Sequence, residues 1–250
     1  MTYLNQRLAT VVVALSIVFL ADAAQAVDKY KVGVPLSQDD AIWLGGSKLA
    51  VVRHDSVETL MRQRALYVPG TVIVLDGKAA KEIRGVSGED PTDILDRELV
   101  PVLEKQFAMA GSGSTLHVDT DKLQEIAGTP TDADYLLDLL PTHRRATAAK
   151  GFNSHYIVGY GVRVALIEKK SGRTIFASTC YSDTSDHPGQ PRLDELAEND
   201  ARLFQMVSDN LAWRCLQRIG NYLLPNPGAI PPPPRELRDP LAAYRSAHPL

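Results

Sequence analysis

The sequence predicts an α+β fold, a single domain whose mainly antiparallel sheet contains a long hairpin and is packed by helices, including a long C-terminal helix. Two observations carry this prediction. Apolar residues alternate from His155 to Ile167, and a second strand-like segment returns from Arg173 to Cys180 after a Ser171-Gly172 turn. From Leu193 to Leu223 the apolar period becomes that of a helix.

Composition supports a packed domain and excludes several classes of protein. The chain has 250 residues, of which 44% are hydrophobic and 23% charged, as is usual for globular proteins. A net charge of -3 gives no reason to expect nucleic-acid binding. Two cysteines are too few for a small disulfide-framework protein or a four-cysteine zinc site.

Residues 1–26 have the pattern of a secretory signal peptide. A basic Arg7 precedes an apolar run from Leu8 to Leu20, and Ala24-Gln25-Ala26 offers a cleavage site. The apolar run is shorter than the roughly 20 residues of a spanning helix. We therefore expect cleavage near Ala26 and a periplasmic or secreted product, with no transmembrane span after signal cleavage and no cysteine at the new terminus to carry a lipid.

The remaining elements follow in chain order. Short apolar segments predict strands at 47–52, 71–75 and 133–140. Asp90-Pro91 opens a helix with an apolar face, which Pro101 should kink and which Gly111–Ser114 should end as a plain linker. A short helix is expected near 121–127. The folded domain would span residues 27–224.

Residues 225–250 form a proline-rich segment of different character. They hold 8 of the 16 prolines, including the run from Pro231 to Pro234. Such a composition favours an extended or disordered tail that adds little to a core. The tail would be disordered unless it serves as a polyproline ligand for a partner.

The export signal changes how the two cysteines are interpreted. In an oxidising compartment an even pair with no other partner is most simply a disulfide, so we predict a bond between Cys180 and Cys215. The bond would join the end of the hairpin to the core face of the long helix. Two buried thiols are the alternative if the compartment is reducing.

Charge is unevenly distributed along the chain. Seven basic residues and one acidic residue lie between Leu139 and Ser182, and an acidic stretch follows from Asp183 to Asp209. The two stretches could face each other within the fold. Alternatively, a basic loop carrying Arg144, Arg145 and Lys150 could contact an anionic surface.

No motif in the sequence signals catalysis. The chain lacks a Gly-x-Ser-x-Gly elbow and a phosphate-binding loop, so we assign no catalytic, cofactor-binding or metal-binding residues. The first hypothesis is a non-catalytic exported protein that binds a partner in envelope assembly or transport. The alternatives are a secreted hydrolase whose site is assembled in space, and a binder of anionic envelope glycan or lipid through the basic loop.

A series of short motifs resembles a group of uncharacterised proteobacterial envelope proteins, many of them lipoproteins. The series covers about residues 70 to 220 and comprises Glu89-Asp90-Pro91, Ala133–Asp138, Tyr156-x-Val158-x-Tyr160, Leu166-Ile167, Ser171-Gly172, Cys180, Leu196–Ala201 and Cys215. The architecture is also similar to the periplasmic domains of curli-secretion and penicillin-binding-protein-activator lipoproteins. These resemblances imply a binding or assembly role and supply no functional residues.

Overall fold

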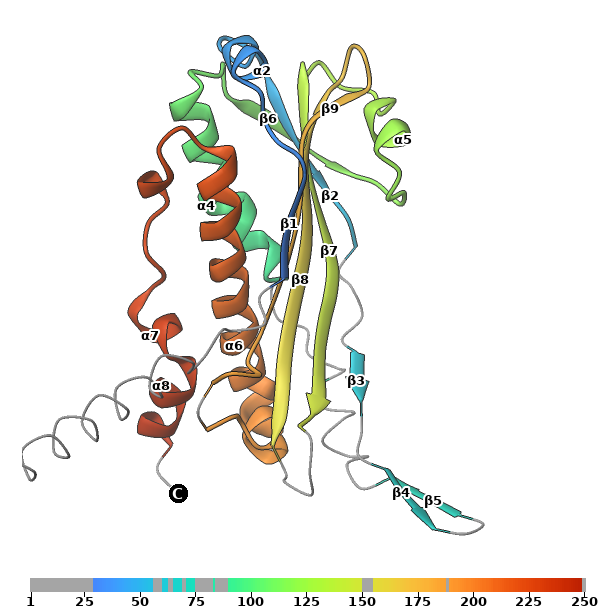
Figure 1. Cartoon of the computed structure of the whole chain (residues 1–250), viewed down its shortest axis with the longest axis vertical. Helices are drawn as coiled ribbons and strands as arrows, with labels where there is room; N and C mark the ends of the chain where they lie inside the picture. The colour runs from blue at the N-terminus through green and yellow to red at the C-terminus, as the bar shows by residue number, and fades with distance from the viewer. Residues whose placement is uncertain are drawn as a thin grey trace, which may run out of the picture.

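The computed structural model describes residues 29–55, 60–62, 65–68, 71–74, 83, 90–149, 155–187 and 189–248. The predicted signal peptide, residues 1–26, lies outside the described residues. The fold is α+β, as predicted from the sequence (Figure 1). An open mixed sheet is packed by helices, and the long C-terminal helix α6 spans Leu193–Leu223, the range that the apolar period predicted.

The long hairpin dominates the sheet. Its strands are β8 and β9, and β7 pairs antiparallel with β8 on the other side, while β1 forms the edge beside β9. The far half of the sheet is parallel, because β2 pairs in parallel with both β7 and β6, and β3 also pairs with β7. The strands span Lys29–Val34 (β1), Leu49–Arg53 (β2), Leu60–Arg62 (β3), Ser112–His117 (β6), Tyr135–Ala148 (β7), Tyr156–Glu168 (β8) and Arg173–Asp183 (β9).

A predicted linker is a strand, and a predicted helix is not split by its proline. The segment Gly111–Ser114 is not a plain linker, because β6 begins at Ser112 and extends the sheet beside β2. Helix α4 (Thr92–Gln106) contains Pro101 yet runs as one helix. Pro101 is exposed, so the carbonyl that loses its helical partner can be solvated by water. The predicted strand near 71–75 is β5 (Thr71–Val74), which pairs with β4 (Ala65–Val68) outside the main sheet.

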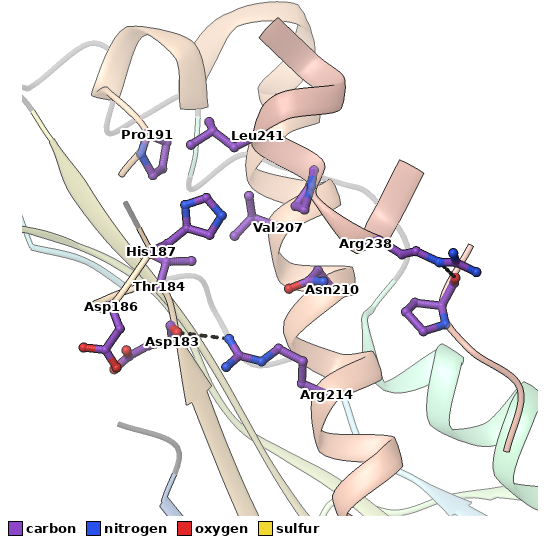
Figure 2. Close-up of a pocket in the computed structure, with 12 residues that line it drawn as sticks. Asp183, Thr184, Asp186, His187, Pro191, Val207, Asn210, Arg214, Arg238 and Leu241 are labelled. Carbon is purple, nitrogen blue, oxygen red and sulfur yellow. Dashed lines mark hydrogen bonds between the residues drawn. The ribbon is translucent and has the colours of Figure 1, made fainter. Parts of the chain in front are cut away.

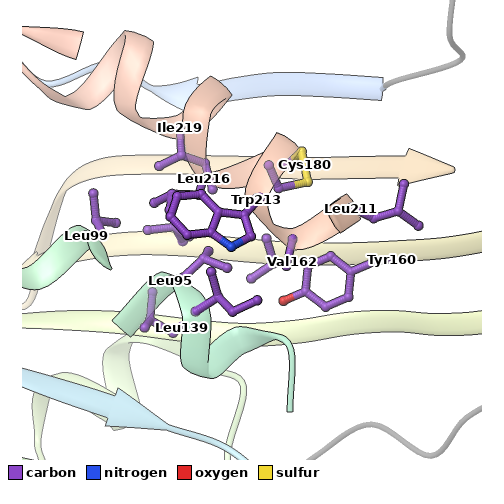
Figure 3. Packing of buried hydrophobic residues seen from close by; sticks show 14 of the residues in the cluster. Leu95, Leu99, Leu139, Tyr160, Val162, Cys180, Leu211, Trp213, Leu216 and Ile219 are labelled. Carbon is purple, nitrogen blue, oxygen red and sulfur yellow. A yellow bond between two sulfur atoms is a disulfide. The ribbon is translucent and has the colours of Figure 1, made fainter. Parts of the chain in front are cut away.

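Helices cover the two faces of the sheet unequally. In Figure 1, α4 and α6 lie together along one face, whereas the short α5 (Leu123–Ala127) packs on the other. The larger core lies between the sheet and the two long helices, where Trp213 of α6 packs among Leu95, Leu139 and Val162 (Figure 3). This core fixes α6 against the hairpin and so positions everything that α6 carries.

Helix α6 is broken near its start. Glu198 is extended, and the next three residues have left-handed backbone angles, with φ of 52° at Asn199, 57° at Asp200 and 56° at Ala201. Side chains other than glycine occupy this region only at a cost in free energy. A short first piece of α6, which includes Leu193 and Leu196, is therefore set at an angle to the long remainder.

The C-terminal segment differs from the disordered tail expected from its prolines. It forms a 3₁₀ turn (Pro227–Ala229) and helices α7 (Arg235–Arg238) and α8 (Pro240–Ala247), which lie along α6. Ile230, Leu241 and Tyr244 are buried against the domain. These three apolar residues, spaced between the prolines, provide enough buried surface to hold the segment in place.

Candidate functional site

A pocket of about 440 Å³ lies between the end of β9, helix α6 and the C-terminal segment. Its size falls within the range of small-ligand sites in proteins. Figure 2 shows its residues, which come from three separate parts of the chain: Asp183, Thr184, Asp186, His187, Pro191, Val207, Asn210, Arg214, Pro233, Arg238, Pro240 and Leu241. Most of the exposed lining is apolar, and polar groups from α6 and the β9–α6 connection interrupt it.

Local structure explains why the first two walls face each other. On α6, Val207, Asn210 and Arg214 follow at spacings of three and four residues, which places them on one helix face. Opposite them, the chain turns after β9 because the Asp183 carboxylate accepts hydrogen bonds from the Ser185 backbone N–H, over 3.0 Å, and from its hydroxyl, over 2.6 Å. Arg214 reaches across to donate to the Asp183 carbonyl oxygen over 3.4 Å.

The third wall is the C-terminal segment, which hydrogen bonds hold to α6. The Asn210 amide of α6 donates to the carbonyl of Leu237, and within the segment Arg238 donates to the carbonyl of Pro233 over 3.2 Å. The Asp239 side chain caps α8 by accepting from the Ala242 N–H over 3.0 Å. The cap and the hydrogen bonds place Leu241 in the lining of the pocket, across from His187 (Figure 2).

The two predicted cysteines lie deeper on the same pair of elements. Cys180 of β9 and Cys215 of α6 form a disulfide, with Cα atoms 5.6 Å apart (Figure 3). Cys215 follows directly after Arg214, and Cys180 lies three residues before Asp183. The bond therefore fixes the distance between the two walls of the pocket. The sequence correctly predicted this pairing, and the structure adds that the bond joins the two elements that carry the first two walls of the pocket.

The three residues proposed for an anionic surface do not form one surface. Arg144 is only 6% exposed: its guanidinium lies 5.2 Å from the centre of the Phe204 ring, donates to Gln205, and has its pKa lowered by burial. Arg145 points to the opposite face of the sheet, where it donates to the Tyr181 hydroxyl over 2.6 Å. Both belong to strand β7 rather than to a loop. Lys150 lies outside the described residues.

The structure contains a buried ionic cluster that was not predicted from the sequence. The Asp138 carboxylate on β7 is fully buried; one oxygen lies 2.5 Å from Nε2 of His54, and the other accepts from Arg163 over 2.9 Å. The cluster lies on the face opposite α4 and α6, and it joins β2, β7 and β8. No spacing in the sequence predicts it, because its members are 84 and 25 residues apart. His54 and Arg163 both bond to the one carboxylate, one at each oxygen, which indicates a structural cluster.

A second hollow, of about 550 Å³, lies at the end of the molecule that carries helix α2 (Gln38–Trp43). Trp43 and Ile42 are 73% and 75% exposed there, although both are large and apolar. Lys169 and Lys170, from the turn between β8 and β9, line the same hollow. Patches of large exposed apolar side chains are more common at interaction surfaces than on the rest of a protein surface.

The described residues contain neither a metal-binding cluster nor a membrane-spanning helix. No group of three or more histidine, cysteine, aspartate or glutamate side chains in these parts of the chain is arranged to hold a metal ion. Among the helices described, none combines the length and the apolar character needed to cross a membrane.

Comparisons with known proteins identify no family. No family model and no curated protein matches the sequence. Similar solved structures include a DUF330 protein from Xanthomonas campestris (14% identity, TM-score 0.32, covering 74% of this chain and 91% of that chain) and a PelC dodecamer from Paraburkholderia phytofirmans (14%, 0.28, 74% and 98%). A third is a lipoprotein from Neisseria meningitidis (9%, 0.28, 70% and 99%). At these identities and TM-scores the likeness assigns neither a family nor a function.

Proposed function

We propose that the protein is exported to the cell envelope and acts there by binding a partner, without catalysis. The observation that carries this proposal is the exposed pair Ile42 and Trp43 on α2. Tryptophan is enriched among the anchors of protein interfaces, because one side chain buries a large area at a small cost in conformational entropy. The partner surface would be this end of the molecule.

Export is supported by the N-terminal pattern and by the cysteine pair. A disulfide persists in an oxidising compartment such as the periplasm, and Cys180 and Cys215 have no other cysteine in the chain to pair with. The expected mature chain begins at Val27. Mass spectrometry of the protein recovered from the periplasmic and cytoplasmic fractions tests this, since a protein that is found only in the cytoplasm and retains residues 1–26 would contradict export.

The charges around Trp43 indicate what the partner should offer. Acidic groups near the hollow are already bound: Asp134 accepts from the Lys48 backbone N–H over 2.8 Å, and Asp40 pairs with Arg173. Lys169 and Lys170 line the hollow together with Asp134 and Glu168, so the charges of the lining balance. The exposed Ile42 and Trp43 would therefore be contacted by an apolar segment of the partner.

Site-specific photo-crosslinking in cells tests the proposed surface. A photoreactive phenylalanine analogue at position 43 should give one dominant crosslinked protein. The same residue at the exposed position 217, on α6, serves as the matched control. Equal products at both positions, or none at position 43, would contradict a partner bound at the α2 end.

A further inference from the structure

We propose that the pocket between α6 and the C-terminal segment binds a small organic anion, namely a carboxylate attached to an apolar body. This inference rests on the proposed binding function and concerns a different place from the α2 end. It names the chemistry that the pocket recognises, which is shared by a free apolar carboxylic acid and by the C-terminus of a peptide ending in an apolar residue.

The apolar body would lie against the walls of the pocket. Val207 is 3% and Leu241 5% exposed, and Pro191 and Pro240 add rigid apolar surface on either side. Prolines and a buried valine lose little side-chain entropy when a ligand packs against them, so such walls are already ordered for binding. A volume of about 440 Å³ accommodates a ligand of roughly amino-acid or dipeptide size.

The carboxylate would bind Arg214. A guanidinium carries five N–H donors in a planar fork that fits a carboxylate with two parallel hydrogen bonds, so it can keep local partners and also hold a ligand. The contact from Arg214 to the Asp183 carbonyl is long, at 3.4 Å. Figure 2 shows the Arg214 guanidinium between α6 and the end of β9, below His187 and Thr184.

The other charged residues of the lining are directed elsewhere. Arg238 donates to the Pro233 carbonyl, and in Figure 2 it points away from the space between His187 and Leu241. The Asp183 carboxylate is engaged by Ser185 within its own turn, and the Asp186 carboxylate, which also lines the pocket, points away from Arg214 in Figure 2. Arg214 is therefore the cation best placed to select an anionic ligand.

Titration of the purified, disulfide-bonded protein tests the inference. N-acetyl-leucine, followed by shifts of the backbone amide signals of Asn210, Arg214 and Leu241 in ¹⁵N-correlated spectra, should bind at least tenfold more tightly than N-acetyl-leucinamide. A hexapeptide ending in leucine, with a free or an amidated carboxyl group, forms the second arm. If the acid form is preferred in just one arm, that arm shows whether the pocket takes a free carboxylic acid or the C-terminus of a peptide. Equal binding of acid and amide in both arms, or binding of neither, overturns the proposal.

Variants locate the site and control for folding. Arg214→Gln should abolish the preference for the acid, and Arg214→Lys should retain part of it, because the charge remains while the fork is lost. Arg235→Gln, at an exposed arginine of the same segment that does not line the pocket, should bind as the wild type does. Leu241→Trp should block both acid and amide. Full binding by Arg214→Gln would overturn the proposal, and melting temperatures identify any variant that has not folded.

These outcomes are separate from those of the crosslinking experiment. The titration uses a small probe and the purified protein, so its failure leaves a partner bound at Trp43 untouched. Conversely, failure of the crosslink at Trp43 together with selective binding of N-acetyl-leucine would leave the pocket as the functional surface of the protein.

Discussion

The Arg245 guanidinium on α8 donates two hydrogen bonds to the Glu195 carboxylate in the first turn of α6, over 2.8 Å from Nε and 3.0 Å from Nη2. Next to it, the Asn199 side-chain amide donates to the Tyr244 hydroxyl over 3.0 Å. Helix α8 is thereby bound to α6 just before the break, at Glu195, and within the break, at Asn199. These contacts offset part of the cost of the left-handed residues and hold the C-terminal segment that closes the pocket.

Replacing Arg245 should loosen α8 without unfolding the domain. Arg245→Gln removes the charge and the two-pronged hydrogen bond, and we expect α8 to lose about 1 kcal/mol of local stability, since the arginine is partly exposed. Hydrogen exchange of the α8 amides should become about five- to tenfold faster. Arg238→Gln on α7 is the control and should leave α8 unchanged, and equal acceleration in both variants would contradict a specific role for the pair.

Lowering the pH should also weaken the docking of α8 on α6. Burial alone raises the pKa of Glu195, but its hydrogen bonds from Arg245 and from the Arg192 N–H outweigh this and hold the pKa below its usual 4.5. Because the folded-state pKa is lowered, the stabilisation is fully present above about 4.5 and is lost as the pH falls through the folded-state value. Exchange of α8 amides, corrected for intrinsic rates, should accelerate below that pH in the wild type. Glu195→Gln should respond less.

Much of the fold could be predicted because its signals are local. Period-two alternation predicted β8, the Ser171-Gly172 turn predicted the hairpin, and the helical period predicted α6 with its correct bounds. The parallel pairing of β2 with β6 and β7 could not be predicted, because strand order is a long-range property. The tail was misjudged for a related reason: its proline content is local, whereas the burial of Tyr244 depends on a partner surface on α6.

A helical glycine provides a test of how the tail docks. Gly220 on α6 lies against Ile230, and a Cβ at this position would overlap Ile230 Cδ1. Glycine to alanine ordinarily stabilises an exposed helix by about 1 kcal/mol. Here Gly220→Ala should instead lower stability by roughly 1–2 kcal/mol by displacing Ile230. When Ile230 is replaced by alanine, the overlap is absent. Urea unfolding should then show that adding Gly220→Ala to Ile230→Ala raises the free energy of unfolding.

The disulfide should make a large contribution to stability. Its loop of 35 residues corresponds to roughly 3–4 kcal/mol in the chain-entropy treatment. The double variant Cys180→Ser/Cys215→Ser should unfold at a correspondingly lower urea concentration. In the wild type, thiol labelling of the unfolded, unreduced protein should find no free cysteine, and two labelled thiols would contradict the bond. Since the bond joins the two elements that carry the first two walls of the pocket, the double variant should also weaken the binding of any ligand there.

The candidate pocket could not be predicted from the sequence because its residues come from three segments that are far apart in the chain. The spacing of Val207, Asn210 and Arg214 on one face of a predicted helix was the only signal present, and it is equally typical of a solvated helix face. The prediction that Arg144 and Arg145 share a loop was wrong for a simpler reason. Arg144 and Arg145 are adjacent, so once β7 extends through them, the alternation of a strand sends them to opposite faces.

Substitution of Asp138 tests whether the buried cluster contributes more to the stability of the fold than a surface ion pair does. Asp138→Asn leaves His54 and Arg163 facing a neutral amide in a fully buried position, and the loss should be about 3 kcal/mol. Asp132→Asn makes the same chemical change at a carboxylate whose side chain is 78% exposed and paired with Lys48, and we expect no measurable effect. Urea unfolding of the two variants measures the difference. Adding Arg163→Gln to Asp138→Asn should recover part of the loss, because the cation left without its carboxylate is then removed as well; a further loss would mean that Arg163 stabilises the sheet through contacts other than Asp138.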